Sequence, residues 1–249
     1  MKKPIIVGNW KANPSTITEA KKNIVAIEKK IKKNNYNYLL AVSHAYISKL
    51  KEIKSHAQLG VQNINGLELG AYTGTSTAQM VKSIGATFSI IGHSEIRARG
   101  ETNENINKKI KQILSAGMVC ILCVGESARD KEAKYLKSIE RQLLEALDGV
   151  DKNLFSKLII AYEPIWAIGA KNPATTHECF EIAIAIRRTL ASFLTIDYAK
   201  KVSILYGGAV TEENASDFIK DGGVDGLLIG RASLDPDTFS KIIINCYAK

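Results

Sequence analysis

The sequence predicts an α/β fold, a single (β/α)₈ barrel that forms one domain over residues 1–249. Short apolar, β-branched segments alternate with amphipathic helical segments from end to end, as in a parallel sheet covered by helices. No Gly-x-Gly-x-x-Gly motif follows the first segment, which disfavours a doubly wound nucleotide-binding sheet. Polar residues follow nearly every expected strand, where barrel enzymes build their active sites.

In chain order, the expected strands are apolar runs without the clean alternation of a half-exposed sheet. They cover residues 5–10, 38–42, 59–62, 88–92, 119–124, 158–162, 202–206 and 226–229. The helical segments between them include 103–116, 128–147, 176–194 and 212–220. No Pro/Ser-rich linker or low-complexity segment interrupts the alternation, so we expect one domain.

The net charge of +9 does not by itself indicate nucleic-acid binding. In the first helical segment, lysines alternate with Ile24, Ile27 and Ile31 at helical spacing, so the lysines form a solvated face. No groove of interleaved basic and aromatic residues is visible. We therefore expect no nucleic-acid partner, although a general positive field would help to capture an anionic metabolite.

The cysteines and the amino-terminal segment indicate a reducing compartment. Four cysteines are few for this length, and we expect thiols rather than disulfides. Cys120 and Cys123 lie in one expected strand, where positions i and i+3 point to opposite faces, so a shared metal is not expected. The apolar run 4–7 is too short for a signal peptide or a membrane span. We expect a cytoplasmic protein without a membrane partner.

Five motifs, in this order and at these strand ends, resemble the triosephosphate isomerase family over essentially the whole chain. Each would be weak evidence alone, and their joint occurrence by chance is negligible. They are Gly8-Asn9-Trp10-Lys11, Ile91-Gly92-His93-Ser94-Glu95, Ala161-Tyr162-Glu163-Pro164-Ile165-Trp166-Ala167-Ile168-Gly169, Tyr206-Gly207-Gly208, and Val224-Asp225-Gly226-Leu227-Leu228-Ile229-Gly230.

The resemblance implies four catalytic residues acting on a small phosphorylated sugar. Triosephosphate isomerase is itself the established example of a glutamate base paired with a neutral histidine. Here Glu163 matches the base and His93 the electrophile that polarises the carbonyl. Lys11 matches the cation that stabilises the enediolate, and Asn9 helps to orient the oxygen. The resemblance implies neither a metal nor an organic cofactor.

The resemblance also implies a phosphate cradle and a closing lid. Gly169, Ala209, Gly230 and Arg231 match the cradle, which binds through unblocked amides. Residues 164–175 match the lid that excludes water from the enediolate. Three further positions are expected to support the site: Glu95 near Lys11, Cys123 in the fifth strand, and Thr73 reaching toward a neighbouring subunit's site.

Several departures from the family pattern keep alternatives open. Arg231 stands where the family has a second glycine, Ala209 replaces a serine, and Pro173 stiffens the lid. A Gly-Arg pair is similar to tetrulose-phosphate isomerases, which makes a four-carbon substrate the first alternative. A weakened barrel that serves as a ligand-binding scaffold is the second.

The expected partner is a second copy of the chain. The resemblance implies a homodimer, and here both ends of an ion pair that crosses the family's subunit contact are absent. Losing both partners of such a pair can be nearly neutral, so we expect the dimer to persist with a less charged contact.

Overall fold

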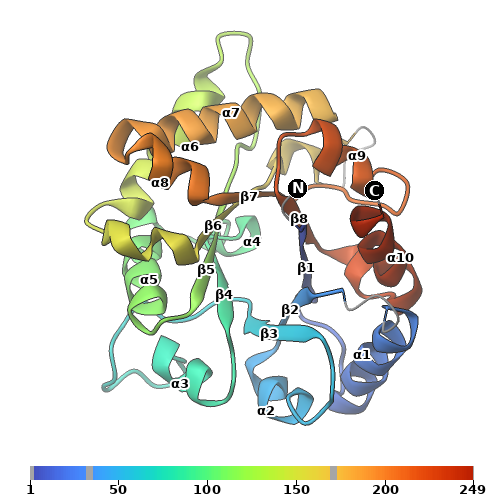
Figure 1. The fold of residues 1–249 in the computed structure, drawn as a ribbon. Helices are drawn as coiled ribbons and strands as arrows, with labels where there is room; N and C mark the ends of the chain where they lie inside the picture. Colours follow the sequence, from blue (N-terminus) through green and yellow to red (C-terminus); the bar gives the residue numbers. More distant parts are fainter. Residues whose placement is uncertain (1–2, 32–35, 169–172, 249) are drawn as a thin grey trace.

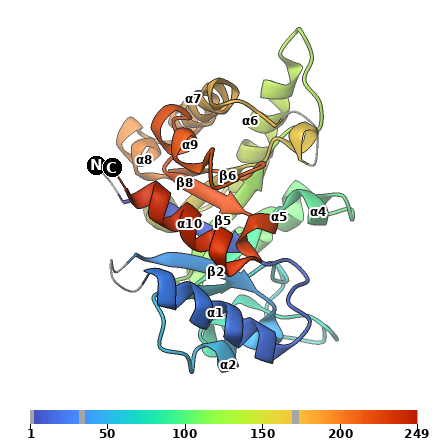
Figure 2. The ribbon, with the colours of Figure 1, turned by 90° about the vertical axis from the view of Figure 1, so that its right-hand side faces the viewer.

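Eight parallel strands close into a barrel in which each strand pairs with its neighbours in the sequence and β8 pairs with β1. The computed structural model describes residues 3–31, 36–168 and 173–248. Helices surround the barrel in both views (Figures 1 and 2). The predicted (β/α)₈ barrel is therefore confirmed.

The strands lie within two residues of their predicted bounds at each end. They are β1 (Ile5–Asn9), β2 (Tyr38–Val42), β3 (Ala57–Val61), β4 (Phe88–Ile91), β5 (Val119–Val124), β6 (Leu158–Tyr162), β7 (Ser203–Tyr206) and β8 (Gly226–Ile229). The helices are α1 (Ile17–Ile31), α2 (Ile47–Leu50), α3 (Ala78–Ser83), α4 (Ser94–Arg97), α5 (Asn103–Ser115), α6 (Lys134–Leu147), α7 (Thr176–Phe193), α8 (Ile196–Lys201), α9 (Ala215–Asp221) and α10 (Pro236–Tyr247). Short 3₁₀ turns are η2 (His44–Tyr46), η3 (Lys152–Lys157), η4 (Ile165–Ala167) and η5 (Arg231–Ser233).

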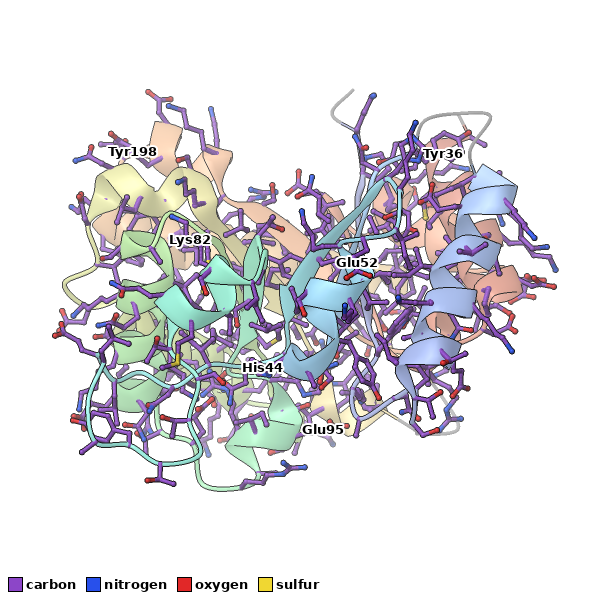
Figure 3. All side chains as sticks on the ribbon, turned by 90° about the horizontal axis from the view of Figure 1, so that it is seen from below. Tyr36, His44, Glu52, Lys82, Glu95 and Tyr198 are labelled. Atoms are coloured by element: carbon purple, nitrogen blue, oxygen red, sulfur yellow. The ribbon has the colours of Figure 1, made fainter. Side chains whose placement is uncertain are left out.

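The core has two layers because successive strand residues point to opposite faces of the sheet. One layer fills the barrel interior and includes Val7, Ile121 and Leu205. The other lies between sheet and helices and includes Ile24 and Ile27 of α1. Charged side chains such as Lys82 and Glu52 lie on the outer helical layer (Figure 3).

These two layers confirm the prediction that Cys120 and Cys123 point to opposite faces of their strand. Cys120 packs outside the sheet and Cys123 packs inside the barrel, so the two thiols face opposite ways. All four cysteines lie within the described residues and are buried, free thiols.

Two predicted helix starts were wrong, since local side-chain contacts compete with helix formation. α6 begins at Lys134 rather than 128, because Ala133 adopts a left-handed conformation (φ 56°) and Arg129 is held by Glu126. α9 begins at Ala215 rather than 212, because Thr211 N–H donates to Asn214 Oδ1 at 2.8 Å in a turn.

The barrel closes between the two ends of the chain. Ile5 to Gly8 pair in register with Gly226 to Ile229. Beside this seam, the buried Trp10 indole N–H donates to the carbonyl of Ser233 at 3.0 Å, across 223 positions of sequence. This seam sets the β1 and β8 ends next to each other. In the described part of the chain, no helix has the length and apolarity needed to cross a membrane.

Candidate active site

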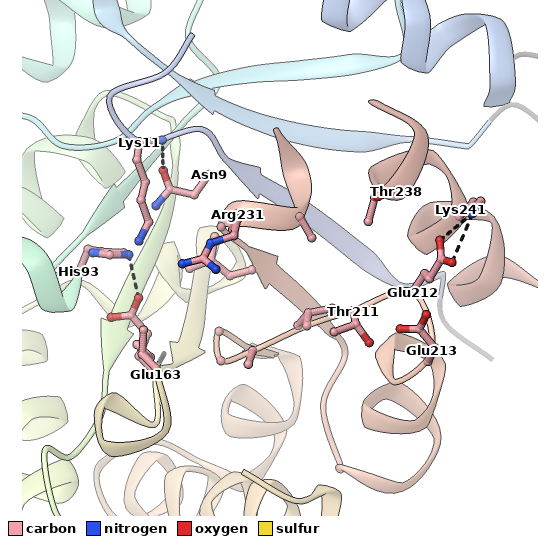
Figure 4. A pocket seen from close by; sticks show the side chains of 18 residues that line it. Asn9, Lys11, His93, Glu163, Thr211, Glu212, Glu213, Arg231, Thr238 and Lys241 are labelled. Atoms are coloured by element: carbon pink, nitrogen blue, oxygen red, sulfur yellow. Dashed lines mark hydrogen bonds and ion pairs between the residues drawn. The ribbon is translucent and has the colours of Figure 1, made fainter. Parts of the chain in front are cut away.

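A cavity of about 770 Å³ opens at the carboxyl ends of the strands. It brings together side chains that follow β1, β4, β6, β7 and β8, and Figure 4 shows them converging from separate strands. Seven of the expected site residues line it: Asn9, Lys11, His93, Glu163, Ala209, Gly230 and Arg231.

The Glu163 carboxylate lies at the inner end of this cavity and is only 3% exposed. Its Oε1 is 3.0 Å from His93 Nε2, and its Oε2 accepts the Ser94 backbone N–H at 2.8 Å. Burial raises the pKa of this carboxyl above its ordinary value, although His93, Ser94 and Lys11 oppose the shift. A buried carboxylate with a raised pKa is a stronger proton acceptor than an ordinary glutamate.

His93 directly precedes α4, and its ring accepts a hydrogen bond from the first turn of this helix. The Glu95 backbone N–H donates to His93 Nδ1 at 3.2 Å. Because a backbone N–H can only donate, Nδ1 carries no proton and the ring proton sits on Nε2. Nε2 therefore presents a donor toward Glu163 and into the cavity.

Lys11 enters the cavity from an unusual backbone position. It has φ 52°, a left-handed conformation that non-glycine residues rarely adopt. The conformation is fixed by two bonds, from Lys11 N–H to Asn9 Oδ1 at 3.1 Å and from Gln62 Nε2 to the Lys11 carbonyl at 2.7 Å. The ammonium then lies 2.6 Å from Glu95 Oε1, so the expected nearness of Glu95 to Lys11 is confirmed.

The β7 end is built from glycines because the chain approaches other groups closely there. A Cβ at Gly207 would lie 3.2 Å from Glu163 Cγ, and one at Gly208 would lie 2.2 Å from the Tyr206 hydroxyl oxygen. A side chain at 208 would clash with Tyr206, and one at 207 would press against the Glu163 side chain. The backbone of 207–209 can therefore lie directly against the Glu163 side chain and the cavity wall.

The remaining expected site residues lie elsewhere. Cys123 is buried in the barrel interior beside Glu163, and its carbonyl accepts from Arg97 at 3.1 Å. Thr73 is exposed in the loop before α3 and does not line the cavity. Gly169 lies outside the described residues, as do residues 170–172 of the expected lid.

Sequence reasoning missed a buried cluster centred on Glu126, directly after β5. Its Oε1 accepts from the Tyr162 hydroxyl at 2.9 Å, from Trp166 Nε1 at 2.8 Å and from Arg129 Nε at 3.1 Å. Arg129 also pairs with Glu178 at the start of α7. The cluster therefore supports the segment that carries Glu163. The rule that polar residues follow strands could have found Glu126.

The far side of the cavity was also missed. There it is lined by residues from the β7–α9 loop and from α10: Thr211, Glu212, Glu213, Thr238 and Lys241. Lys241 pairs with Glu212 at 3.0 Å. No strand-end pattern indicates these residues, because they belong to a loop and a helix.

Comparison with known proteins gives one consistent result. The model of the family described as triosephosphate isomerase matches residues 4–246. Relatives named triosephosphate isomerase include those of Alkaliphilus oremlandii, 36% identical over 98% of this chain and 99% of the relative, and Porphyromonas gingivalis, 39% identical with the same coverage. A solved triosephosphate isomerase structure from Bartonella henselae superposes with a TM-score of 0.86 at 34% identity, covering 99% of this chain and all of that one. The chain belongs to the triosephosphate isomerase family.

Proposed function

We propose that this isomerase interconverts dihydroxyacetone phosphate and glyceraldehyde 3-phosphate through an enediolate, with Glu163 as the base. The single observation that carries these roles is the buried Glu163 carboxylate lying against the neutral His93 ring, in a cavity also lined by Lys11. The names of the relatives favour the three-carbon substrate over the four-carbon and scaffold alternatives.

Each catalytic role follows from the position of a group. The Glu163 carboxylate removes a proton from one substrate carbon and returns it to the adjacent carbon. His93 Nε2–H donates to the carbonyl oxygen, so the substrate replaces the present contact between Nε2 and Glu163. Negative charge develops on that oxygen, and the Lys11 ammonium stabilises it with help from Asn9.

We assign the substrate's phosphate group to the ends of β7 and β8, across the cavity from Glu163 and His93. The backbone amides at Ala209 and Gly230 are assigned as donors to the phosphate oxygens, because both residues line the cavity and Gly230 carries no side chain. Gly169, from outside the described residues, is proposed as a third donor. No group of three or more potential metal ligands occurs among the described residues, and function without a cofactor stays a prediction.

Steady-state assays on the purified protein test the assignment. We expect rapid turnover of both triose phosphates and much slower turnover of tetrulose phosphates. Preference for the four-carbon compounds would contradict the proposed substrate. Binding without turnover of either class would indicate a scaffold.

The pH profile should report the burial of Glu163. The base must be deprotonated to act, so kcat/KM should fall as pH falls through its pKa. Because burial raises that pKa, the acidic limb should lie above the pH at which an ordinary glutamate titrates. The measurement is kcat/KM between about pH 4 and 9, since that ratio reports the free enzyme. A limb at the ordinary glutamate value would contradict a desolvated base.

We also propose that the chain works as a single-domain homodimer in the cytoplasm, where a glycolytic enzyme meets its substrates. Support for the dimer comes from large apolar side chains exposed on the loop before α3 and on α3. Such a patch is typical of a protein contact. It contains Leu67, Leu69, Tyr72, Met80 and Ile84, exposed by 37–62%.

Placing charges in this patch should break the dimer. We expect the double variant Leu69→Glu/Tyr72→Glu to sediment as a monomer at micromolar concentration and to lose activity, because burying two carboxylates at a contact is costly. Ile196→Glu is the matched control, since Ile196 is 64% exposed but lies at the start of α8. A wild-type monomer, or an unchanged double variant, would contradict the proposal.

A further inference from the structure

Strand β4 leaves the sheet early, and this departure brings His93 into the cavity. Its pairing with β5 ends at Ile91, opposite Leu122, whereas β5 continues to Val124. The backbone groups at the end of β5 therefore lie beyond their last β4 partner. Buried backbone groups need a replacement partner, because leaving one unpaired costs free energy. Here the replacements are two side chains from the surrounding helices.

Arg97, the last residue of α4, bridges the carbonyls on both sides of this gap. Its Nε donates to the Gly92 carbonyl at 2.8 Å, and its Nη2 donates to the Cys123 carbonyl at 3.1 Å. Its Nη1 donates to Asn103 Oδ1 at 2.6 Å, at the start of α5. Because a guanidinium is planar and rigid, bonds to three elements fix their relative positions. Gly92 directly precedes His93, so the backbone that carries the imidazole is fixed as well.

Gln142, on α6, holds the backbone beside Glu163. Its Oε1 accepts the Gly125 N–H at 3.1 Å, and its Nε2 donates to the Gly125 carbonyl at 2.8 Å, as a neighbouring strand would. A Cβ at Gly125 would overlap the Glu163 carbonyl oxygen, so the two backbones are in direct contact. Glu163 N–H also donates to the Val124 carbonyl at 2.8 Å. A shift of residue 125 would therefore move the base.

We infer that Arg97 and Gln142 are positioning residues for the isomerisation. They hold, from outside the barrel, the two backbone segments whose side chains meet in the 3.0 Å contact between His93 Nε2 and Glu163 Oε1 (Figure 4). Neither positioning residue lines the main cavity. The inference rests on the proposed function, since it takes His93 as the electrophile and Glu163 as the base. A misplacement of about 1 Å can lower a rate by about 100-fold, so loss of either contact should be measurable.

A second cavity makes chemical rescue a direct test of Arg97. This cavity of about 480 Å³ lies between α4, α5 and α6, and both Arg97 and Gln142 line it. In Arg97→Ala, free guanidinium ion can enter it and donate to the Gly92 and Cys123 carbonyls. We expect kcat of this variant to fall by about 30-fold, with KM changed less than about threefold. Guanidinium, well below denaturing concentrations, should then restore kcat severalfold, whereas sodium at equal ionic strength should not.

Arg141→Ala is the matched control, since Arg141 lines the same cavity but its side chain is 77% exposed and pairs with Glu145. It should keep wild-type constants and show no response to guanidinium. Arg97→Lys keeps the charge but loses the planar fork, so its kcat should lie between those of wild type and Arg97→Ala. This variant also serves if Arg97→Ala does not fold.

Gln142→Leu tests the contact beside Glu163. Leucine has a similar size but leaves both backbone groups of Gly125 without their partner, so kcat should fall by about tenfold with little change in KM. Gln112→Leu, the same change on α5 away from both cavities, should keep wild-type constants. Wild-type kcat in both Arg97→Lys and Gln142→Leu would overturn the inference.

Magnetic resonance of the isotope-labelled imidazoles, without substrate, separates this inference from the proposed function. Wild-type His93 should show a slowly exchanging Nε2 proton because Nε2 faces the buried Glu163, and the signal is assigned by its absence from His93→Gln. Arg97→Ala should lose this signal and guanidinium should restore it, a result that supports the inference even if the wild type turns over no triose phosphate. An active wild type with an unchanged His93 signal and no rescue in Arg97→Ala would overturn the inference while the isomerase function stands.

Discussion

Replacing Glu163 with glutamine should lower kcat by about 10³-fold, within the range of roughly 10²–10⁴ that a positioned general base contributes. The amide has nearly the same shape but cannot accept a proton at neutral pH. Because the substrate's phosphate contacts lie elsewhere in the cavity, KM should change by less than about threefold. Steady-state kinetics with glyceraldehyde 3-phosphate measure both constants.

Glu213→Gln is the matched control for this variant, because Glu213 lines the same cavity from the β7–α9 loop. It should retain nearly full kcat. If Glu163→Gln retained more than about a tenth of wild-type kcat, a different group would have to move the proton. Exchange of substrate carbon-bound hydrogen with deuterated solvent gives a second readout, and this exchange should also be lost.

Replacing Lys11 with methionine should lower kcat/KM by about 10²–10³-fold, the range measured when one group that stabilises a developing oxyanion is removed. Both side chains are unbranched and have similar length, and both pay the same cost for φ 52°. The change therefore isolates the charge. Measurement of kcat/KM at low substrate concentration reports the lost stabilisation of the transition state.

Lys241→Met provides the control for Lys11→Met. Both lysines line one cavity and both pair with a glutamate, but Lys241 lies on the far side with Glu212. A general effect of cavity charge would weaken both variants alike. If Lys11 stabilises charge at the reacting atoms, kcat/KM should fall far more in Lys11→Met than in Lys241→Met. Similar losses in the two variants would remove Lys11 from the catalytic set.

The strands could be predicted from sequence because their burial on both faces leaves continuous apolar runs. The Val119–Val124 run, for example, supplies Cys120 to the outer core and Cys123 to the barrel interior. The start of α6 could not be predicted. The Ala128–Ala133 segment has a composition typical of a helix. Arg129, however, contacts Glu126 and the distant residues Tyr162 and Glu178, and these contacts hold the segment outside the helix.

Some features of the candidate site could also be predicted from the sequence, and others could not. Lys11, His93 and Glu163 each follow a strand, and closure of the barrel necessarily brings strand ends to one rim. The tautomer of His93 was not visible in the sequence, because it depends on a backbone donor at Glu95. The pairing of Lys241 with Glu212 is likewise a property of their surroundings in space, not of their neighbours in the chain.

The seam between β1 and β8 has a consequence for synthesis of the protein. Lys11 leaves the ribosome more than 200 residues before the strand that completes its surroundings, Gly226–Ile229. Until then β1 and β7 present open edges that can pair with another nascent polypeptide. A message truncated before the β8 segment would therefore give an aggregation-prone product rather than a partly active one.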